Sequence, residues 1–113
     1  MNQATPPTTT TPAASQRLHA PFQASANVRT RIKICGLTRE EDVDAAVAGG
    51  ADAVGFVLYA PSPRAVTPQR AAQLARRLPP FVTPVLLFVN ESTPNVIAAS
   101  TMIAGATVQF HGD

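Results

Sequence analysis

Three residues of this 113-residue chain combine reactive side chains with positions where functional sites form: Cys35, Arg64 and His111. Cys35 and His111 each end a short apolar segment, and Arg64 lies in a proline-containing loop after another such segment. A thiolate can act as a base or nucleophile, a guanidinium binds carboxylates, and an imidazole transfers protons near neutral pH. Each residue also has a purely structural interpretation: a small buried thiol, a solvated surface arginine and a core histidine held by one hydrogen bond.

The segment 31–35 predicts how the cysteine is positioned. Ile32 and Ile34 alternate with the residues beside them, as in a short β-strand, and Gly36 interrupts the pattern. Thr38 followed by Glu41 then predicts a helix that begins with a capping box. Cys35 is therefore expected at the carboxyl end of a strand, which is the end where parallel α/β folds bind ligands.

The rest of the chain repeats the same step of a strand followed by a helix. Each strand is nearly continuous in apolar residues, and Thr67 and Thr93, each followed by proline, are expected to cap helices. The expected strands span 31–35, 52–58, 84–89 and 106–111, and the expected helices span 39–48, 67–78 and 93–104. This order predicts an α/β fold with parallel strands and right-handed crossovers.

Alternation within the strands indicates which side chains share a face. Thr107, Gln109 and His111 lie on one face of the last strand, opposite Val108 and Phe110. If both strands present their odd-numbered residues to the same side, Cys35 and His111 face one crevice, and Lys33 shares it. Gly55, inside the second strand, predicts close approach by another group.

Composition excludes several classes of protein. A single cysteine cannot form an internal disulfide, and it leaves too few ligands for a structural zinc site. Nine basic residues against seven acidic ones are scattered, without a basic stripe interleaved with aromatic residues, so we expect no nucleic-acid partner. Arg76 and Arg77 are the one basic pair, and we expect them in the last turn of a helix. The apolar runs are too short for a membrane helix, and we expect no membrane partner.

Residues 1–30 differ from the rest of the chain. Thr, Pro, Ala, Ser and Gln dominate there, and no acidic residue occurs. The segment lacks the apolar core of a secretory signal, and although organelle transit peptides share its acid-poor composition, no amphipathic helix is evident. We expect a disordered tail, or a start codon assigned too far upstream, with a folded part that begins near Arg29.

Six short motifs, in this order, resemble the phosphoribosylanthranilate isomerase family of tryptophan biosynthesis. They are 33–39 (KICGLTR), 50–57 (GADAVGFV), 62–64 (SPR), 78–82 (LPPFV), 87–90 (LFVN) and 108–113 (VQFHGD). The resemblance covers residues 31–113, which is the whole expected folded part. It implies a parallel (β/α)₈ TIM barrel, of which this chain contains the first four strands and three helices.

The resemblance also implies a reaction and roles for three residues. The reaction is the Amadori rearrangement of N-(5-phosphoribosyl)anthranilate to 1-(2-carboxyphenylamino)-1-deoxyribulose 5-phosphate, in the cytoplasm and without a metal or other cofactor. An acid protonates the ring oxygen of the sugar, and a base removes the proton from C2. Cys35 matches the family's general base, Arg64 matches the arginine that holds the anthranilate carboxylate, and His111 matches a residue that lines the substrate pocket.

The chain also departs from the family pattern. The family's general acid is an aspartate on the fifth strand, and its phosphate site follows the seventh and eighth strands; Asp113 follows the fourth strand and does not match that acid. Two smaller differences are Ala65, where tyrosine is frequent, and Leu86, where glycine is frequent. Leu86 adds bulk where a glycine allows close packing, so we expect altered local packing.

Three functional interpretations remain open. The chain is the amino-terminal half of an isomerase whose full length carries the activity, so that this half alone has little or none. Alternatively, it is a non-catalytic half-barrel that associates with itself or with a complementary carboxyl-terminal half, because its last strand would expose an apolar flank. A third interpretation is a thiol enzyme with Cys35 as nucleophile and His111 as base.

Overall fold

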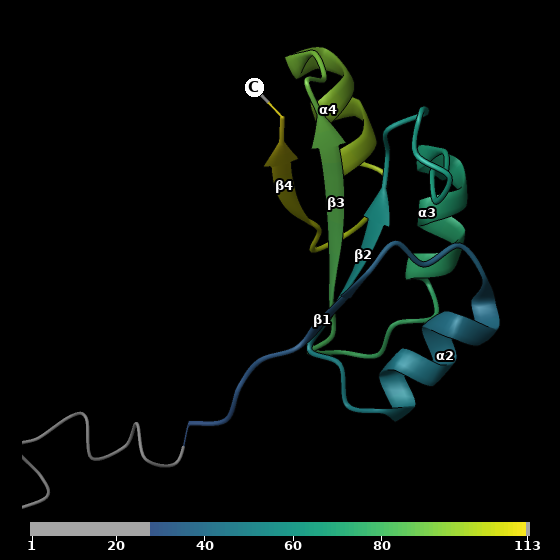
Figure 1. Ribbon diagram of the computed structural model, residues 1–113, viewed down its shortest axis with the longest axis vertical. Coiled ribbons are helices and arrows are strands. Elements are labelled where there is room, and N and C mark those ends of the chain that lie inside the picture. Colours follow the sequence, from purple (N-terminus) through teal and green to yellow (C-terminus); the bar gives the residue numbers. More distant parts are fainter. Residues whose placement is uncertain (1–27, 113) are drawn as a thin grey trace, which may run out of the picture. The chain divides into compact units, whose positions relative to one another are not determined.

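The computed structural model describes residues 28–112, which form one α/β unit from Arg31 onward (Figure 1). The expectation that residues 1–30 form a disordered tail falls mostly outside the described residues. The elements are β1 (Lys33–Cys35), α2 (Glu40–Ala48), β2 (Ala53–Val57), α3 (Pro68–Ala75), β3 (Thr83–Val89), α4 (Thr93–Ser100) and β4 (Thr107–His111). Every strand and helix expected from the sequence is present, with bounds shifted by a few residues.

The four strands form a single parallel sheet in the order β1-β2-β3-β4, which confirms the predicted topology. Each strand pairs with the next one along the chain, and each connection contains one helix. The register aligns Cys35 with Gly55, Gly55 with Val85, and Val85 with Thr107. Because side chains alternate along a strand, this row defines one face of the sheet.

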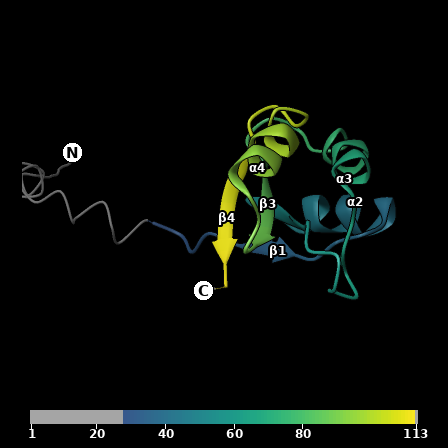
Figure 2. The same cartoon turned by 90° about the horizontal axis from the view of Figure 1, so that it is seen from above.

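The three helices all cover the other face of the sheet, as Figure 2 shows. Val54, Phe56, Leu86 and Phe88 point to this helix-covered face and are almost wholly buried. They pack against apolar helix residues, namely Val43, Ala71, Leu74, Val96, Ala99 and Ile103. Leu86, where the family often has glycine, is fully buried in this core, so its bulk forms part of the packing between sheet and helices.

Two predicted helix starts are wrong by one residue. The N-cap of α2 is Arg39 rather than Thr38, and no side chain caps it, so the expected capping box does not form. The N-cap of α4 is Ser92, so Thr93 lies in the first turn, and α4 ends at Ser100 instead of near residue 104. The cap of α3 is as predicted: Thr67 accepts a hydrogen bond from the backbone N–H of Arg70.

Two arginine–carboxylate pairs join α2 to α3. Arg70 binds Glu40, and Arg77 binds Asp44, each through two hydrogen bonds of 2.6 to 2.8 Å. Arg76 is the C-cap of α3, and Arg77 lies just beyond it. The prediction that both occupy the last turn of the helix is therefore wrong. Arg77 instead makes a contact to a carboxylate 33 positions earlier in the chain.

Apolar side chains are exposed at both edge strands of the sheet. Phe110 on β4 packs at 6.5 Å between ring centroids against Phe88, yet it stays 70% exposed. On β1, Ile34 is 38% exposed. Within residues 28–112, β1 and β4 each pair with one strand only, so the apolar flank predicted for the last strand is confirmed.

Among the helices that the structure describes, none is long and apolar enough to span a bilayer.

Candidate active site

Cys35 is the last residue of β1, so it lies at the end of the sheet where the parallel strands have their carboxyl ends. Its side chain is half-buried and on the face without helices. Its neighbour in the register is Gly55, and a methyl group on Gly55 would come within 2.8 Å of the Cys35 sulfur. The predicted close approach at Gly55 is therefore confirmed, and the approaching group is the thiol. The backbone N–H of Gly36 donates to the carbonyl of Gly55 at 2.9 Å, which fixes the chain just beyond the thiol.

Arg64 lies at the same end of the sheet, in the loop between β2 and α3. Its backbone N–H donates to the Ser62 hydroxyl, and Ala65 forms a bridge with Val57 at the end of β2. The guanidinium lies against Gly36, because a methyl group there would come within 2.7 Å of Nη1 of Arg64. Arg64 therefore lies beside the residue that follows Cys35, where its guanidinium could bind a carboxylate.

His111 is the last residue of β4, so it lies at the same end of the sheet as Cys35 and on the same face. Its side chain is exposed. The two residues do not share a row, because Cys35 aligns through Gly55 and Val85 with Thr107, four positions before His111. No hydrogen bond joins Cys35 to His111 in the part of the chain that the structure describes. This arrangement does not support a nucleophile–base pair of these two residues.

Sequence reasoning missed a polar contact on the same face of the sheet. The Lys33 ammonium donates a hydrogen bond of 2.7 Å to Oε1 of Gln109, although 76 positions separate the two residues. Alternation correctly assigned Lys33 to the face of Cys35 and Gln109 to that of His111, but it could not show that they meet. The signal available was two long polar side chains on an otherwise mostly apolar face.

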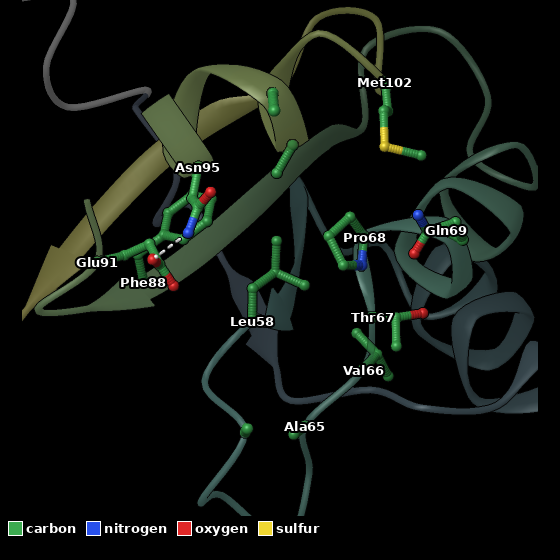
Figure 3. Close-up of a pocket in the computed structure, with 13 residues that line it drawn as sticks. Leu58, Ala65, Val66, Thr67, Pro68, Gln69, Phe88, Glu91, Asn95 and Met102 are labelled. Carbon is green, nitrogen blue, oxygen red and sulfur yellow. Dashed lines mark hydrogen bonds between the residues drawn. The ribbon is translucent and has the colours of Figure 1, made fainter. Parts of the chain in front are cut away.

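The helix-covered side of the sheet has a separate cavity of about 550 Å³ between α3 and α4 (Figure 3). Phe88 and Leu58 contribute apolar surface to it, and Glu91 accepts a hydrogen bond of 2.8 Å from Asn95 at its rim. Neither Cys35, Arg64 nor His111 lines this cavity. Cys35 and His111 instead lie on the opposite face of the sheet.

The described residues contain no group of three or more His, Cys, Asp or Glu side chains arranged to hold a metal ion. The site as built offers a thiol, a guanidinium and an imidazole at one edge. Asp113 lies outside the described residues.

Comparison with known proteins agrees with the motif pattern. The sequence model of the N-(5'-phosphoribosyl)anthranilate isomerase family matches residues 32–113. Curated relatives of that name from Dechloromonas aromatica and Methylibium petroleiphilum are 65% and 67% identical over 86 residues, or 76% of this chain. The chain spans about two fifths of the length of these relatives.

Solved structures give the same result. A phosphoribosyl anthranilate isomerase from Thermotoga maritima matches 75% of this chain and 42% of its own, with a TM-score of 0.73 and 42% identity. A second isomerase structure, in complex with reduced 1-(o-carboxyphenylamino)-1-deoxyribulose 5-phosphate, matches with a TM-score of 0.72 and 42% identity, over 75% of this chain and 44% of its own. Fold, motif order and sequence identity agree, and the chain belongs to the N-(5'-phosphoribosyl)anthranilate isomerase family.

Proposed function

We propose that residues 31–113 form the first half of an isomerase barrel that converts N-(5-phosphoribosyl)anthranilate to 1-(2-carboxyphenylamino)-1-deoxyribulose 5-phosphate in tryptophan biosynthesis. The observation that carries this proposal is that Cys35 lies at the carboxyl end of a strand in a parallel sheet and that the Arg64 guanidinium lies against the next residue, Gly36. The relatives' names support the reaction, and the structure solved with a reduced product analogue supports a phosphoribosyl ligand.

Each of the three site residues takes the role that its chemistry suits. Cys35, as thiolate, removes the proton from C2 after the sugar ring has opened to a Schiff base. Arg64 binds the anthranilate carboxylate through charge-assisted hydrogen bonds and so orients the ring next to the base. His111 lines the pocket at the end of β4. None of these steps requires a metal or an organic cofactor.

The same proposal requires groups that residues 28–112 do not supply. An acid must protonate the ring oxygen, and cationic or backbone groups must hold the phosphate. Losing one acid–base group alone costs about 10²–10⁴-fold in rate. The 113-residue chain by itself should therefore show little or no isomerase activity.

One observation favours a second candidate function, that of a half-barrel that associates with another chain. Both edge strands lack a second partner strand within the described residues, and both expose apolar side chains. Association with a second copy or with a complementary half would cover these edges. Sedimentation of the purified chain separates the outcomes, since a folded, soluble dimer supports this function and a monomer argues against it.

A transplant tests the isomerase proposal. Residues 31–113 replace the matching segment of the Dechloromonas aromatica relative, which is 65% identical, so that the relative supplies the remaining strands. We expect this hybrid barrel to consume N-(5-phosphoribosyl)anthranilate at a rate within about tenfold of the intact relative, whereas the 113-residue chain does not. A folded hybrid without activity would contradict the proposal.

A further inference from the structure

The segment that follows Cys35 is held by an arginine from a different helix. Arg70 donates through Nη1 to Oε2 of Glu40 at 2.6 Å and through Nη2 to Oε1 of Glu40 at 2.8 Å. Nη2 also donates to the backbone carbonyl of Thr38 at 3.2 Å. These contacts are partly buried, and a two-pronged arginine–carboxylate pair has a defined geometry that a single contact lacks.

Arg70 joins two loops of the candidate site. Thr38 and Glu40 flank the start of α2, which is the end of the loop that begins at Gly36. On its backbone side, the N–H of Arg70 donates to the hydroxyl of Thr67, the residue that ends the loop carrying Arg64. One residue is thus bonded both to the loop after Cys35 and to the loop after β2.

The contact between Arg64 and Gly36 depends on how these two loops are placed. The guanidinium of Arg64 fits against Gly36 because that residue has no side chain, with Nη1 2.7 Å from where a methyl group would be. A small displacement of either loop would separate the guanidinium from the end of β1. We propose that Arg70, with Glu40, is a positioning residue that holds the Arg64 guanidinium against Gly36, the residue that follows Cys35.

This inference deepens the proposed function, on which its catalytic meaning rests, since a base and a carboxylate-binding group must keep a fixed separation. Its geometric content can be tested without catalysis. Cys35 is the only cysteine among the 113 residues, so alkylation of the chain reports on a single thiol. Iodoacetate is an anion and iodoacetamide is neutral, and the ratio of their rate constants reports positive charge near the sulfur.

The first comparison establishes that the ratio reports Arg64. Arg64→Gln should lower it, because in water a unit charge changes the energy of an anion about 6 Å away by an amount that corresponds to about a threefold change in rate. Using the ratio cancels changes in thiol ionisation and accessibility, which alter both rate constants together. If Arg64→Gln leaves the ratio unchanged, the guanidinium does not lie beside Cys35, and the proposal is overturned.

Glu40→Gln separates positioning from long-range electrostatics by the sign of its effect. Removing a negative charge would by itself raise the ratio, whereas releasing Arg70 and displacing Arg64 lowers it. We expect the ratio to fall in Glu40→Gln and in Arg70→Met. A ratio that stays constant or rises in Glu40→Gln would overturn the proposal.

The chain offers a matched control. Arg77 lies just beyond the end of α3, seven residues after Arg70, and it binds Asp44 of α2 through two hydrogen bonds of similar length. Arg77→Met removes the same charge and the same kind of contact between α2 and α3, but it touches neither loop, so the ratio should stay constant. If Arg77→Met lowers the ratio as much as Arg70→Met, the pairs only fasten the helices, and the proposal fails.

Arg70→Lys keeps the positive charge but cannot form the two parallel hydrogen bonds of the guanidinium to Glu40. It is the variant to use if Arg70→Met does not fold. Its ratio should fall below that of the unchanged chain, and an unchanged ratio in a folded Arg70→Lys would count against the proposal. The ratio is independent of turnover, so an inactive hybrid barrel with the expected ratios would refute the proposed function and leave the positioning role intact.

Discussion

Gly55 gives the thiol of Cys35 the space that it occupies at the end of β1. The two residues are aligned across the strand pair, and a methyl group on Gly55 would lie 2.8 Å from the sulfur and 3.3 Å from the Cys35 Cα. Cys35 is thereby oriented over the neighbouring strand on the face where Lys33 and Gln109 also meet. The Cys35 thiol can take this position because Gly55, in the adjacent strand, has no side chain.

Gly55→Ala is expected to reduce stability by about 1–3 kcal/mol, as overpacking of a close contact does. Part of that cost comes from the sulfur, so it should be smaller in a chain that already carries Cys35→Ala. Urea denaturation of the two single variants and the double variant measures this coupling. Strict additivity of the two substitutions would contradict the close contact.

Gly36→Ala is expected to cost more than Gly50→Ala. Both glycines have positive φ, +86° and +92°, so alanine is strained at either position. At Gly50 nothing lies within 4 Å of an added methyl group, whereas at Gly36 the Arg64 side chain lies at 2.7 Å. The difference in unfolding free energy between the two variants isolates the contact with Arg64.

Removing the Arg64 side chain supplies the control for that comparison. In an Arg64→Ala background, Gly36→Ala and Gly50→Ala should have similar costs, because only the backbone strain remains. A persistent excess cost at Gly36 would show that another group fills the space.

The stability of the fold should depend on acid through Glu40. The pKa of Glu40 is lowered from 4.5 to about 2. The main cause is the hydrogen bonding from the Arg70 guanidinium, and a hydrogen bond from the backbone of Glu40 itself adds to it. Because the folded-state pKa is lower than the unfolded one, the ion pair stabilises the fold above about pH 4.5, and this stabilisation is lost as the pH falls toward 2. The difference in unfolding free energy between the unchanged chain and Glu40→Gln should therefore shrink over that interval.

Urea denaturation from neutral pH down to about pH 2 measures this difference. Acid also weakens other carboxylate contacts, since pairing with Arg77 lowers the pKa of Asp44. Asp44 is present in both chains that are compared, so its loss of pairing in acid cancels from the difference between the unchanged chain and Glu40→Gln. A difference for Glu40→Gln that is constant with pH would rule out the proposed role of the ionised carboxylate.

Phe110 is expected to promote association of the isolated chain. Its side chain is 70% exposed on an edge strand, where a second chain could add and cover it. Phe110→Gln should shift the sedimentation of the chain toward the monomer. Phe81→Gln is the control, because Phe81 is 100% exposed but lies in a turn before β3, and it should leave the association unchanged.

Local patterns predicted the strands, the helices and the face on which each strand residue lies. Parallel strands at this spacing, with Cys35 and His111 each at a carboxyl end, followed from alternation and from glycine and proline positions alone. The roles of Cys35, Arg64 and His111 came from motif resemblance and remain predictions, because charge and shape at a site depend on residues that meet through the fold.

The errors have a common physical cause. Thr38 and Glu41 have the spacing of a capping box, but the carbonyl of Thr38 is bonded to Arg70, 32 positions later. A basic residue near the end of a helix is typical of its last turn, but Arg77 lies beyond the helix and binds Asp44 instead. Contacts between distant segments decided these details, and a window of a few residues contains no information about them.

The rate of isomerisation by the hybrid barrel with Cys35→Ala tests the central claim most directly. If Cys35 is the base that removes the C2 proton, kcat should fall by about 10²–10⁴-fold while the barrel remains folded and still binds the product. A Cys35→Ala hybrid that turns over at the rate of the unchanged hybrid would contradict the account.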